Sequence, residues 1–184
     1  MNCVDNTERR SLLNERRGVS SLQGRTPAGK TTFAREYLPG YAKVVHFVNA
    51  DLIAGGLAPL RPEMAAIAAG RLFLKELDRL AESHVDFAFE STLSGVGHIS
   101  RLTRWKALGY RIEIIYLTLP SPRMALRRIA ARVRQGGHNV PKPEVLRRFR
   151  RSWQNFRNLY QPLANRWRVY DNSGDRPRLV DKGS

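Results

Sequence analysis

The chain has 184 residues, of which 42% are hydrophobic and 9% aromatic, and its formal net charge is +16. This length and composition predict one globular domain and exclude a disordered chain. No stretch approaches the roughly 20 apolar residues of a membrane span, the polar N-terminus lacks the apolar core of a secretory signal, and the single cysteine, Cys3, excludes an internal disulfide. We therefore expect a cytoplasmic protein without a membrane partner.

The positive charge lies mainly in the last third of the sequence. Residues 123–184 contain 16 basic and four acidic side chains, whereas residues 36–122 contain nine of each. A basic surface can bind nucleic acid, or the phosphate groups of a nucleotide and of a phosphorylated substrate. For most of these arginines, Arg127 and Arg128 included, a solvated helix face is the simplest interpretation.

The first 23 residues are polar and predict an irregular N-terminal segment, with at most a short polar strand over residues 19–23. From Gly24 onward we expect one folded domain that extends to residue 184. Its first helix is predicted from Lys30 to just before Pro39, because proline and glycine end helices.

Beyond this helix, short apolar runs rich in β-branched residues alternate with longer segments that have apolar residues at helical spacing. The predicted strands are 44–48, 87–89, 111–119 and 167–170. The predicted helices are 62–83, 99–108, 122–134 and 143–160, with a loop over 135–141. Strands that alternate with helices predict an α/β fold, a doubly wound and mostly parallel sheet with helices on both faces.

A glycine-rich motif precedes the first predicted helix. Gly24-x-x-x-x-Gly29-Lys30-Thr31 matches the phosphate-loop pattern at every defined position, with Thr32 directly after it. Glycines let backbone N–H groups wrap around a phosphate, and the following helix adds a positive dipole. Lys30 is expected to reach the β- and γ-phosphates of ATP, and Thr31 to bind Mg²⁺ through its hydroxyl. The motif predicts a P-loop kinase that uses ATP and magnesium.

Two acidic residues follow predicted strands. Asp51 comes just after residues 44–48, and Glu90 just after residues 87–89. Ligands of parallel α/β sheets lie outside the carboxyl ends of the strands, so both carboxylates are expected to face the phosphate loop. A kinase needs one carboxylate to accept the proton of the substrate hydroxyl and another to hold magnesium or orient the substrate. The alternative for each residue is a helix cap or a surface acid.

Arginines flank the predicted loop at 135–141, within an Arg-rich region over about residues 123–150. Arginine binds phosphate oxygens in a bidentate way and keeps its charge. Two helices joined by this glycine-containing loop predict a lid that brings arginines onto the transferring phosphate. Arg134 is preferred because it ends a helix beside the glycines. The candidates are Arg132, Arg134, Arg147 and Arg148.

Five segments together resemble the zeta-toxin-like family of P-loop kinases, in particular its branch of stand-alone, ATPase-like proteins. They are residues 28–36 (AGKTTFARE), 48–54 (VNADLIA), 89–94 (FESTLS), 132–139 (RVRQGGHN) and 170–173 (YDNS). The resemblance covers about residues 24–172, nearly the whole chain.

The resemblance implies phosphoryl transfer from ATP, with magnesium, to a hydroxyl of a UDP-activated N-acetyl amino sugar, a cell-wall precursor. By resemblance, Asp51 is the base that takes the proton of the sugar hydroxyl, and Glu90 and Thr92 lie on the substrate side. Some members of this family are toxins that a small antitoxin protein holds inactive, so an antitoxin is a candidate partner.

The same resemblance assigns the remaining candidate residues. Arg134, together with Arg147 or Arg148, would serve as a lid arginine, and Asn172 and Ser173 would lie near the nucleotide base. Together with the phosphate-loop residues, these side chains complete the expected nucleotide and acceptor sites.

The N-terminal side of the phosphate loop departs from the family. Its members usually begin with an apolar strand that runs into a loop resembling Gly-Pro-Asn-Gly-Ala-Gly-Lys-Thr, whereas here Pro27 lies inside the loop and the preceding segment is polar. Codons allowed for Ser20 through Pro27, read two bases later, can spell Val-Ile-Ala-Gly-Pro-Asn. One hypothesis is therefore that the segment before about Ala28 is translated out of frame; incompatible codons in the genomic DNA would exclude it.

Other functions stay open at this point. The basic C-terminal third suggests a nucleic-acid-directed kinase, although its aromatic residues are not interleaved with the arginines as a stacking surface requires, so a nucleic-acid partner is not expected. A degenerate, toxin-like protein that binds nucleotide without transferring phosphate is a further alternative. Another small-molecule kinase would share the fold, and fold alone does not choose between these functions.

Overall fold

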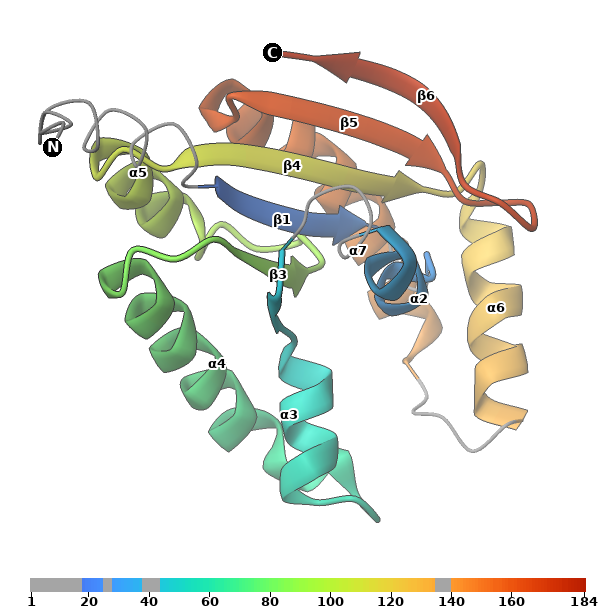
Figure 1. The fold of residues 1–184 in the computed structure, drawn as a ribbon. Helices are drawn as coiled ribbons and strands as arrows, with labels where there is room; N and C mark the ends of the chain where they lie inside the picture. The colour runs from blue at the N-terminus through green and yellow to red at the C-terminus, as the bar shows by residue number, and fades with distance from the viewer. Residues whose placement is uncertain (1–17, 25–27, 38–43, 135–139) are drawn as a thin grey trace, which may run out of the picture.

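The computed structural model describes residues 18–24, 28–37, 44–134 and 140–184 (Figure 1). Within them, six strands form one sheet in the order β2-β3-β1-β4-β5-β6. All neighbouring strands are parallel except β5 and β6. The predicted α/β fold with a mostly parallel sheet is confirmed. The strands are β1 (Gly18–Gly24), β2 (His46–Val48), β3 (Phe87–Ser91), β4 (Arg111–Thr118), β5 (Arg166–Asp171) and β6 (Arg178–Gly183).

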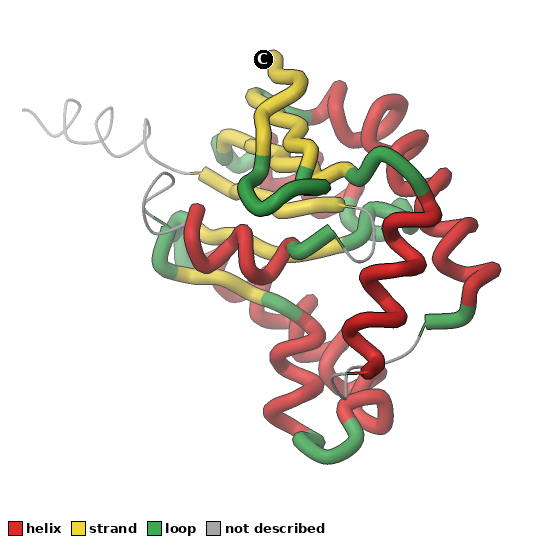
Figure 2. Tube along the Cα trace, turned by 90° about the vertical axis from the view of Figure 1, so that its right-hand side faces the viewer, coloured by secondary structure: helices red, strands yellow, loops and turns green. Residues whose placement is uncertain are grey.

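Helices cover both faces of this sheet, and the turned view shows the strands lying between them (Figure 2). The helical segments are α2 (Lys30–Tyr37), α3 (Ala50–Leu57), η2 (Pro62–Ala65), α4 (Ala66–Glu82), α5 (Ile99–Ala107), α6 (Pro122–Arg134), α7 (Lys142–Asn155), η3 (Phe156–Tyr160) and η4 (Gln161–Leu163). One buried cluster joins the sheet to α4, α5 and the π-helical turn η3, and a second joins its other face to α2, α6 and α7. The expected double winding is therefore present.

β4 shows how the sheet divides the core. Ile112, Ile114 and Tyr116 belong to the cluster with α4 and α5, whereas Ile115 and Leu117 belong to the cluster with α2 and α6. Successive side chains of a strand point to opposite faces, so a strand that is buried on both sides has a continuous apolar sequence. This is why the sequence predicts β4 so clearly.

β1 differs from the prediction of an irregular segment over residues 1–23. Residues 18–24 form a strand at the centre of the sheet, with Leu22 opposite Glu90 of β3 and Ile115 of β4. Two parallel neighbours supply its backbone hydrogen bonds, so the tertiary context outweighs its polar composition. The polar sequence nevertheless has a cost, because the buried Ser21 hydroxyl has no hydrogen-bond partner among the described residues. Residues 1–17 lie outside the described part of the chain.

Three elements, α3, the short η4 and β6, have no counterpart among the predicted elements. α3 contains Gly55 and Gly56, which are poor helix formers, and is held by a capping side chain at Asn49. β6 is an exposed antiparallel strand whose polar sequence resembles a loop. In the described residues, no helix is both long and apolar enough to cross a membrane.

Candidate functional site

The candidate site lies at the carboxyl ends of β1, β2 and β3, where α2 and α3 begin. β1 ends at Gly24 and α2 starts at Lys30, with residues 25–27 of the predicted phosphate loop outside the described part of the chain. A Cβ atom on Gly24 would lie 2.8 Å from the carbonyl oxygen of Leu117. Gly29 has a φ of +69°, and a Cβ there would lie 2.9 Å from Asn172 Nδ2. Backbone conformation and close packing therefore explain glycine at both motif positions.

A lysine, a hydroxyl and a carboxylate meet directly after this loop. Lys30 is buried with 8% of its side chain exposed, and its Nζ lies 3.5 Å from Glu90 Oε1. The Thr31 hydroxyl donates a hydrogen bond of 2.8 Å to Glu90 Oε2. β1 and β3 are hydrogen-bonded neighbours, and Glu90 lies opposite Leu22, close to the carboxyl end of β1. Glu90 is part of β3, whereas the sequence predicts it just after this strand. The structure places Glu90 against the phosphate loop, close to where Thr31 would bind a metal.

Asn49 joins this cluster and was not a predicted site residue. Its side chain is almost fully buried, and its Nδ2 donates to Glu90 Oε2 at 2.7 Å and to Thr31 Oγ1 at 3.5 Å. Its Oδ1 accepts from the backbone N–H groups of Asp51 and Leu52 at the start of α3. An asparagine directly before a helix is a capping signal, but nothing in the sequence shows that the same amide contacts the phosphate loop.

Asp51 lies in the first turn of α3, at the carboxyl end of β2. Its side chain is exposed, and within the described residues no hydrogen bond or ion pair holds its carboxylate. This arrangement differs from that of Glu90, which makes three polar contacts. Asp51 is therefore accessible to a ligand that enters from solvent.

The end of β5 closes the other side of the phosphate loop. Asn172 Nδ2 donates to the carbonyl oxygen of Ala28 at 2.6 Å. Arg128 of α6 donates to the carbonyl oxygens of Asn172 and Ser173 at 2.7 and 3.2 Å, and it is partly buried. The expectation that Arg128 is a solvated arginine is therefore wrong, because a contact with a distant segment, invisible in the local pattern, engages its guanidinium.

A small pocket of about 190 Å³ adjoins this edge. Gly29 and Thr32 of the phosphate loop line it together with Phe33, Asn172 and Asp175. Three of the predicted nucleotide-binding residues, Gly29, Thr32 and Asn172, therefore line one hollow between the start of α2 and the turn after β5. Its position fits the base or ribose of a nucleotide whose phosphates lie on the loop.

The loop after β3 carries the predicted substrate residue Thr92. The hydroxyls of Thr92 and Ser94 lie 2.9 Å apart and share a hydrogen bond. The intervening Leu93 is buried and has a φ of 49°. Asn155 Nδ2 donates to the Leu93 carbonyl oxygen at 2.7 Å, and the Tyr160 hydroxyl donates to that of Gly95 at 2.8 Å. The end of α7 and the following π-helical turn thus hold the predicted substrate residue Thr92 in place.

Three of the predicted lid arginines have no hydrogen bond or ion pair with the Lys30 cluster among the described residues. Arg134 is the exposed last residue of α6, and the loop 135–139 lies outside the described part of the chain. Arg147 and Arg148 both pair with Glu144 on their own helix, at 2.7 and 2.5 Å. These guanidinium groups hold the pKa of the Glu144 carboxyl below its usual value.

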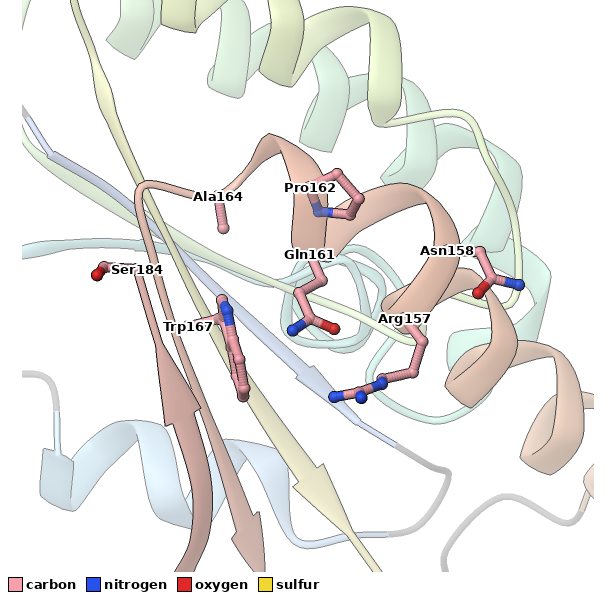
Figure 3. Close-up of a pocket in the computed structure, with 7 residues that line it drawn as sticks. All are labelled: Arg157, Asn158, Gln161, Pro162, Ala164, Trp167 and Ser184. Carbon is pink, nitrogen blue, oxygen red and sulfur yellow. The ribbon is translucent and has the colours of Figure 1, made fainter.

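A second hollow lies elsewhere on the described chain. A pocket of about 620 Å³ is lined by Arg157, Gln161 and Trp167, at the amino end of β5 (Figure 3). Ligands of parallel sheets bind at the carboxyl ends of the strands, which is the opposite end of this sheet. None of the predicted site residues lines this pocket, so it does not mark the phosphate-binding site.

The donor set beside the phosphate loop fits magnesium. No group of three or more His, Cys, Asp or Glu side chains that could hold a metal occurs in the described ranges. Magnesium does not need such a group, because it is bound by one or two protein oxygens together with phosphates and water. The Thr31 hydroxyl and the Glu90 carboxylate, 2.8 Å apart, provide oxygen ligands of this kind.

The parallel sheet order and the phosphate-loop cluster define the fold as that of P-loop kinases, which supports a kinase-type function. The sequence pattern of the zeta-toxin family matches residues 61–179. A protein from Haemophilus influenzae, described only as an uncharacterized protein, is 32% identical over 126 residues, which cover 68% of this chain and 88% of the relative. The chain belongs to the zeta-toxin family. The matched pattern begins at residue 61, after the phosphate loop and Asp51. The inclusion of those residues in the candidate site therefore rests on the geometry described above.

Solved structures agree on the fold. The PezAT toxin–antitoxin system of Streptococcus pneumoniae contains a chain with a TM-score of 0.67 at 14% identity, covering 99% of this chain and 83% of that one. The AvrRxo1-ORF1:-ORF2 complex with ATP gives a TM-score of 0.68 at 19% identity, covering 92% of this chain and 61% of that one. A proposed kinase from Chloroflexus aurantiacus gives a TM-score of 0.56 at 14% identity, covering 71% of this chain and 73% of that one.

Proposed function

We propose that this protein transfers the γ-phosphoryl group of ATP to a hydroxyl of a UDP-activated N-acetyl amino sugar. The observation that carries the proposal is the cluster of Lys30, Thr31 and Glu90, with the accessible carboxylate of Asp51 at the adjoining strand end. Family membership supports the kinase-type reaction. The sugar-nucleotide acceptor rests on the resemblance of the site segments to that family.

The phosphate-loop side binds the nucleotide. Gly24, Gly29 and the start of α2 direct backbone N–H groups at the phosphates, and Lys30 supplies a positive charge for the β- and γ-phosphates. Asn172, held by Arg128, supports the loop and adjoins the pocket for base or ribose. Thr31 and Glu90 would hold Mg²⁺, which neutralises charge on the phosphates when bound.

The acceptor side carries out proton transfer and positioning. Asp51 accepts the hydroxyl proton as the acceptor oxygen forms its bond to the γ-phosphorus and the bond from that phosphorus to the ADP oxygen breaks. Thr92, fixed through its hydrogen bond with Ser94, orients the acceptor through its hydroxyl. Arg134 and Arg147, which flank the predicted lid loop, supply positive charge to the transferred group.

The test measures ATP turnover with magnesium, with and without UDP-N-acetylglucosamine, for the wild type, Lys30→Ala and Asp51→Asn. We expect stimulation by the sugar nucleotide that both substitutions abolish. Asp181→Asn is the matched control, because Asp181 is an exposed acid of β6 whose carboxylate pairs with Arg157. Stimulation that survives both substitutions would refute the proposed roles. Nucleotide binding without turnover by the wild type would favour a non-catalytic, degenerate member.

One observation favours a second candidate, a kinase directed at nucleic acid. α6 contains no acidic residue, and Arg123, Arg127, Arg150 and Arg151 have no ion-pair partner in the part of the chain that the structure describes. Exposed arginines without ion-pair partners can neutralise the phosphates of a nucleic acid. This candidate predicts transfer to an oligonucleotide end and binding that weakens steeply as salt rises, whereas sugar-nucleotide transfer predicts neither.

We also propose a small protein partner that controls the activity, because two structural relatives come from a toxin–antitoxin system and a two-protein complex. The check is toxicity of the chain when it is expressed alone, compared with Lys30→Ala. If cells that express the wild type grow as well as cells that express Lys30→Ala, the activity is not toxic and the proposal of an antitoxin partner fails.

A further inference from the structure

Asn49 uses both ends of one buried amide, and each end contacts a different part of the candidate site. Its relative exposure is 4%. On one side, Oδ1 accepts from Asp51 N at 2.8 Å and Leu52 N at 3.1 Å. On the other side, Nδ2 donates to Glu90 Oε2 at 2.7 Å and to Thr31 Oγ1 at 3.5 Å. The first turn of α3 is thereby linked to the phosphate loop.

These partners determine the orientation of the amide. The two backbone N–H groups of α3 can only donate, so the side-chain atom that faces them must be the carbonyl oxygen. The amide nitrogen must then face the Glu90 carboxylate, because an ionised carboxylate can accept hydrogen bonds but cannot donate them. The Thr31 hydroxyl donates to the same Glu90 oxygen and accepts from Asn49. A hydroxyl can donate one hydrogen bond and accept others, so both contacts fit this orientation of the amide.

Helix capping alone explains only half of these contacts. The start of α3 requires an oxygen acceptor, which serine or aspartate provides as well as asparagine. The NH₂ group is required only by Glu90 and Thr31. Serine is too short to span both sides, and aspartate would place a carboxylate against that of Glu90. The residue type at this position is therefore explained by the link between the two sides.

We propose that Asn49 is a positioning residue of the transfer site, which holds Asp51 at a fixed place relative to Glu90 and Thr31. The inference rests on the proposed function for the chemical roles of those three residues. Asp51 and Thr31 come from different strand ends, on β2 and β1, and β3 with Glu90 lies between them in the sheet. The amide of Asn49 bridges this gap, so the group that accepts the proton and the groups beside the phosphates keep one mutual arrangement.

The test compares three substitutions that separate capping from linking. Asn49→Ser and Asn49→Asp keep an acceptor for α3 and lose the donor to Glu90, whereas Asn49→Ala loses both. We expect all three to lower kcat by about tenfold or more, as for other outer contacts that orient reacting groups, with KM for the acceptor little changed. A cap alone predicts that Asn49→Ser and Asn49→Asp keep wild-type turnover and that only Asn49→Ala falls. That pattern would overturn the inference.

Asn165→Asp is the matched control for the change of an amide to a carboxylate. Asn165 accepts from the backbone N–H of Ile112 at 2.9 Å through its side-chain oxygen, at the amino end of β4. This substitution removes an NH₂ group at the end of the sheet opposite the candidate site, so we expect wild-type turnover. An equal loss in this control would show that the substitution itself, and not the link, lowers the rate.

A melting-temperature cycle tests the link without any turnover. Asn49→Asp should lower the melting temperature through repulsion from Glu90. Adding Glu90→Gln should restore part of it, since the introduced glutamine amide can donate to the introduced aspartate carboxylate. Additive effects would overturn the inference whether or not the wild type is active. Coupled effects in an inactive wild type would instead refute the proposed function while showing that the link exists.

Discussion

The two sides of the candidate site differ in how far the protein itself organises them. On the phosphate-loop side, Lys30, Thr31, Asn49 and Glu90 are buried or partly buried and contact one another. On the side where we propose that the acceptor binds, Asp51 is exposed, and its carboxylate makes no polar contact with the other described residues. Groups that meet the same triphosphate in every cycle can be arranged in advance, whereas groups that meet an entering acceptor must be left accessible.

The largest expected effect tests whether the exposed Asp51 carboxylate accepts the proton in the transfer step. Asp51→Asn should lower kcat by about 1,000-fold, within the range of positioned acid–base groups, because the amide cannot take the hydroxyl proton. ATP affinity should not change, since no described contact joins Asp51 to the phosphate loop except through its backbone. Steady-state kinetics and a nucleotide titration measure the two quantities. A parallel loss of ATP affinity would contradict this division of roles.

The second effect concerns the support of the acceptor-side loop. His98 packs against the rings of Phe73 and Phe89, and its Nδ1 has no hydrogen-bond partner in the described ranges. Burial, with a smaller contribution from the charge of Arg101, lowers the pKa of His98 to about 4 from its ordinary value of 6.5. The unfolded chain therefore binds a proton at this side chain below pH 6.5, and the folded chain only below about 4.

Stability should accordingly be fully present above pH 6.5 and be lost as the pH falls toward 4, by about 3 kcal/mol from this group. Denaturant unfolding at pH 7 and at pH 4 gives the free-energy difference, and His98→Leu should reduce it by that amount. If wild type and variant lose the same free energy on acidification, His98 is not the titrating group.

A smaller effect is expected at the centre of the sheet. Ser21 and Ser152 are each 1% exposed, but within the described residues only the Ser152 hydroxyl has a hydrogen-bond partner, the Tyr116 hydroxyl at 2.7 Å. Ser21→Ala should raise the free energy of unfolding by about 1 kcal/mol, because it removes a buried hydroxyl that makes no hydrogen bond within the described residues. Ser152→Ala should lower it, since the Tyr116 hydroxyl would lose this partner. Thermal or denaturant unfolding of both variants checks the opposite signs.

The smallest effect separates two adjacent arginines of α6. Arg127 is exposed, and its substitution by alanine should change the free energy of unfolding by no more than about 0.5 kcal/mol. Arg128→Ala should cost more and should weaken ATP binding, because Arg128 holds the carbonyl oxygens of Asn172 and Ser173. Equal effects of the two variants in unfolding and in nucleotide titration would remove Arg128 from the site.

The sequence predicts the fold class because it depends on local patterns. The sequence also predicts Glu90 at the ligand-binding end of the sheet, although the structure has Glu90 within β3 and not after it. Apolar runs alternate with helical periodicity along the chain, and a residue just after a buried strand lies at the ligand-binding end of a parallel sheet. The pairing of Glu90 with Lys30 and Thr31 agrees with this rule. The roles of Asp51, Thr92, Arg134, Arg147 and Asn172 in transfer and binding stay predictions for the kinetic tests.

Contacts between distant residues account for what the sequence does not predict. β1 is polar and becomes a central strand only because β3 and β4 pair with it. The local sequence around Asn49 indicates a helix cap, but its side chain also contacts Glu90, which is 41 positions further along the chain. The local sequence around Arg128 indicates a surface arginine, but its partners, the carbonyl oxygens of Asn172 and Ser173, lie 44 and 45 residues further on. No local pattern contains these relations.

The bond between Asn172 and the Ala28 carbonyl oxygen connects residues that are 144 positions apart. Contacts of such separation form late, since the entropy of closing a long loop must be overcome before they contribute. The phosphate loop therefore receives its last support only when β5 has docked beside β4. During synthesis on the ribosome, the Ala28 carbonyl oxygen therefore waits for this bond until the residues up to Asn172 have emerged.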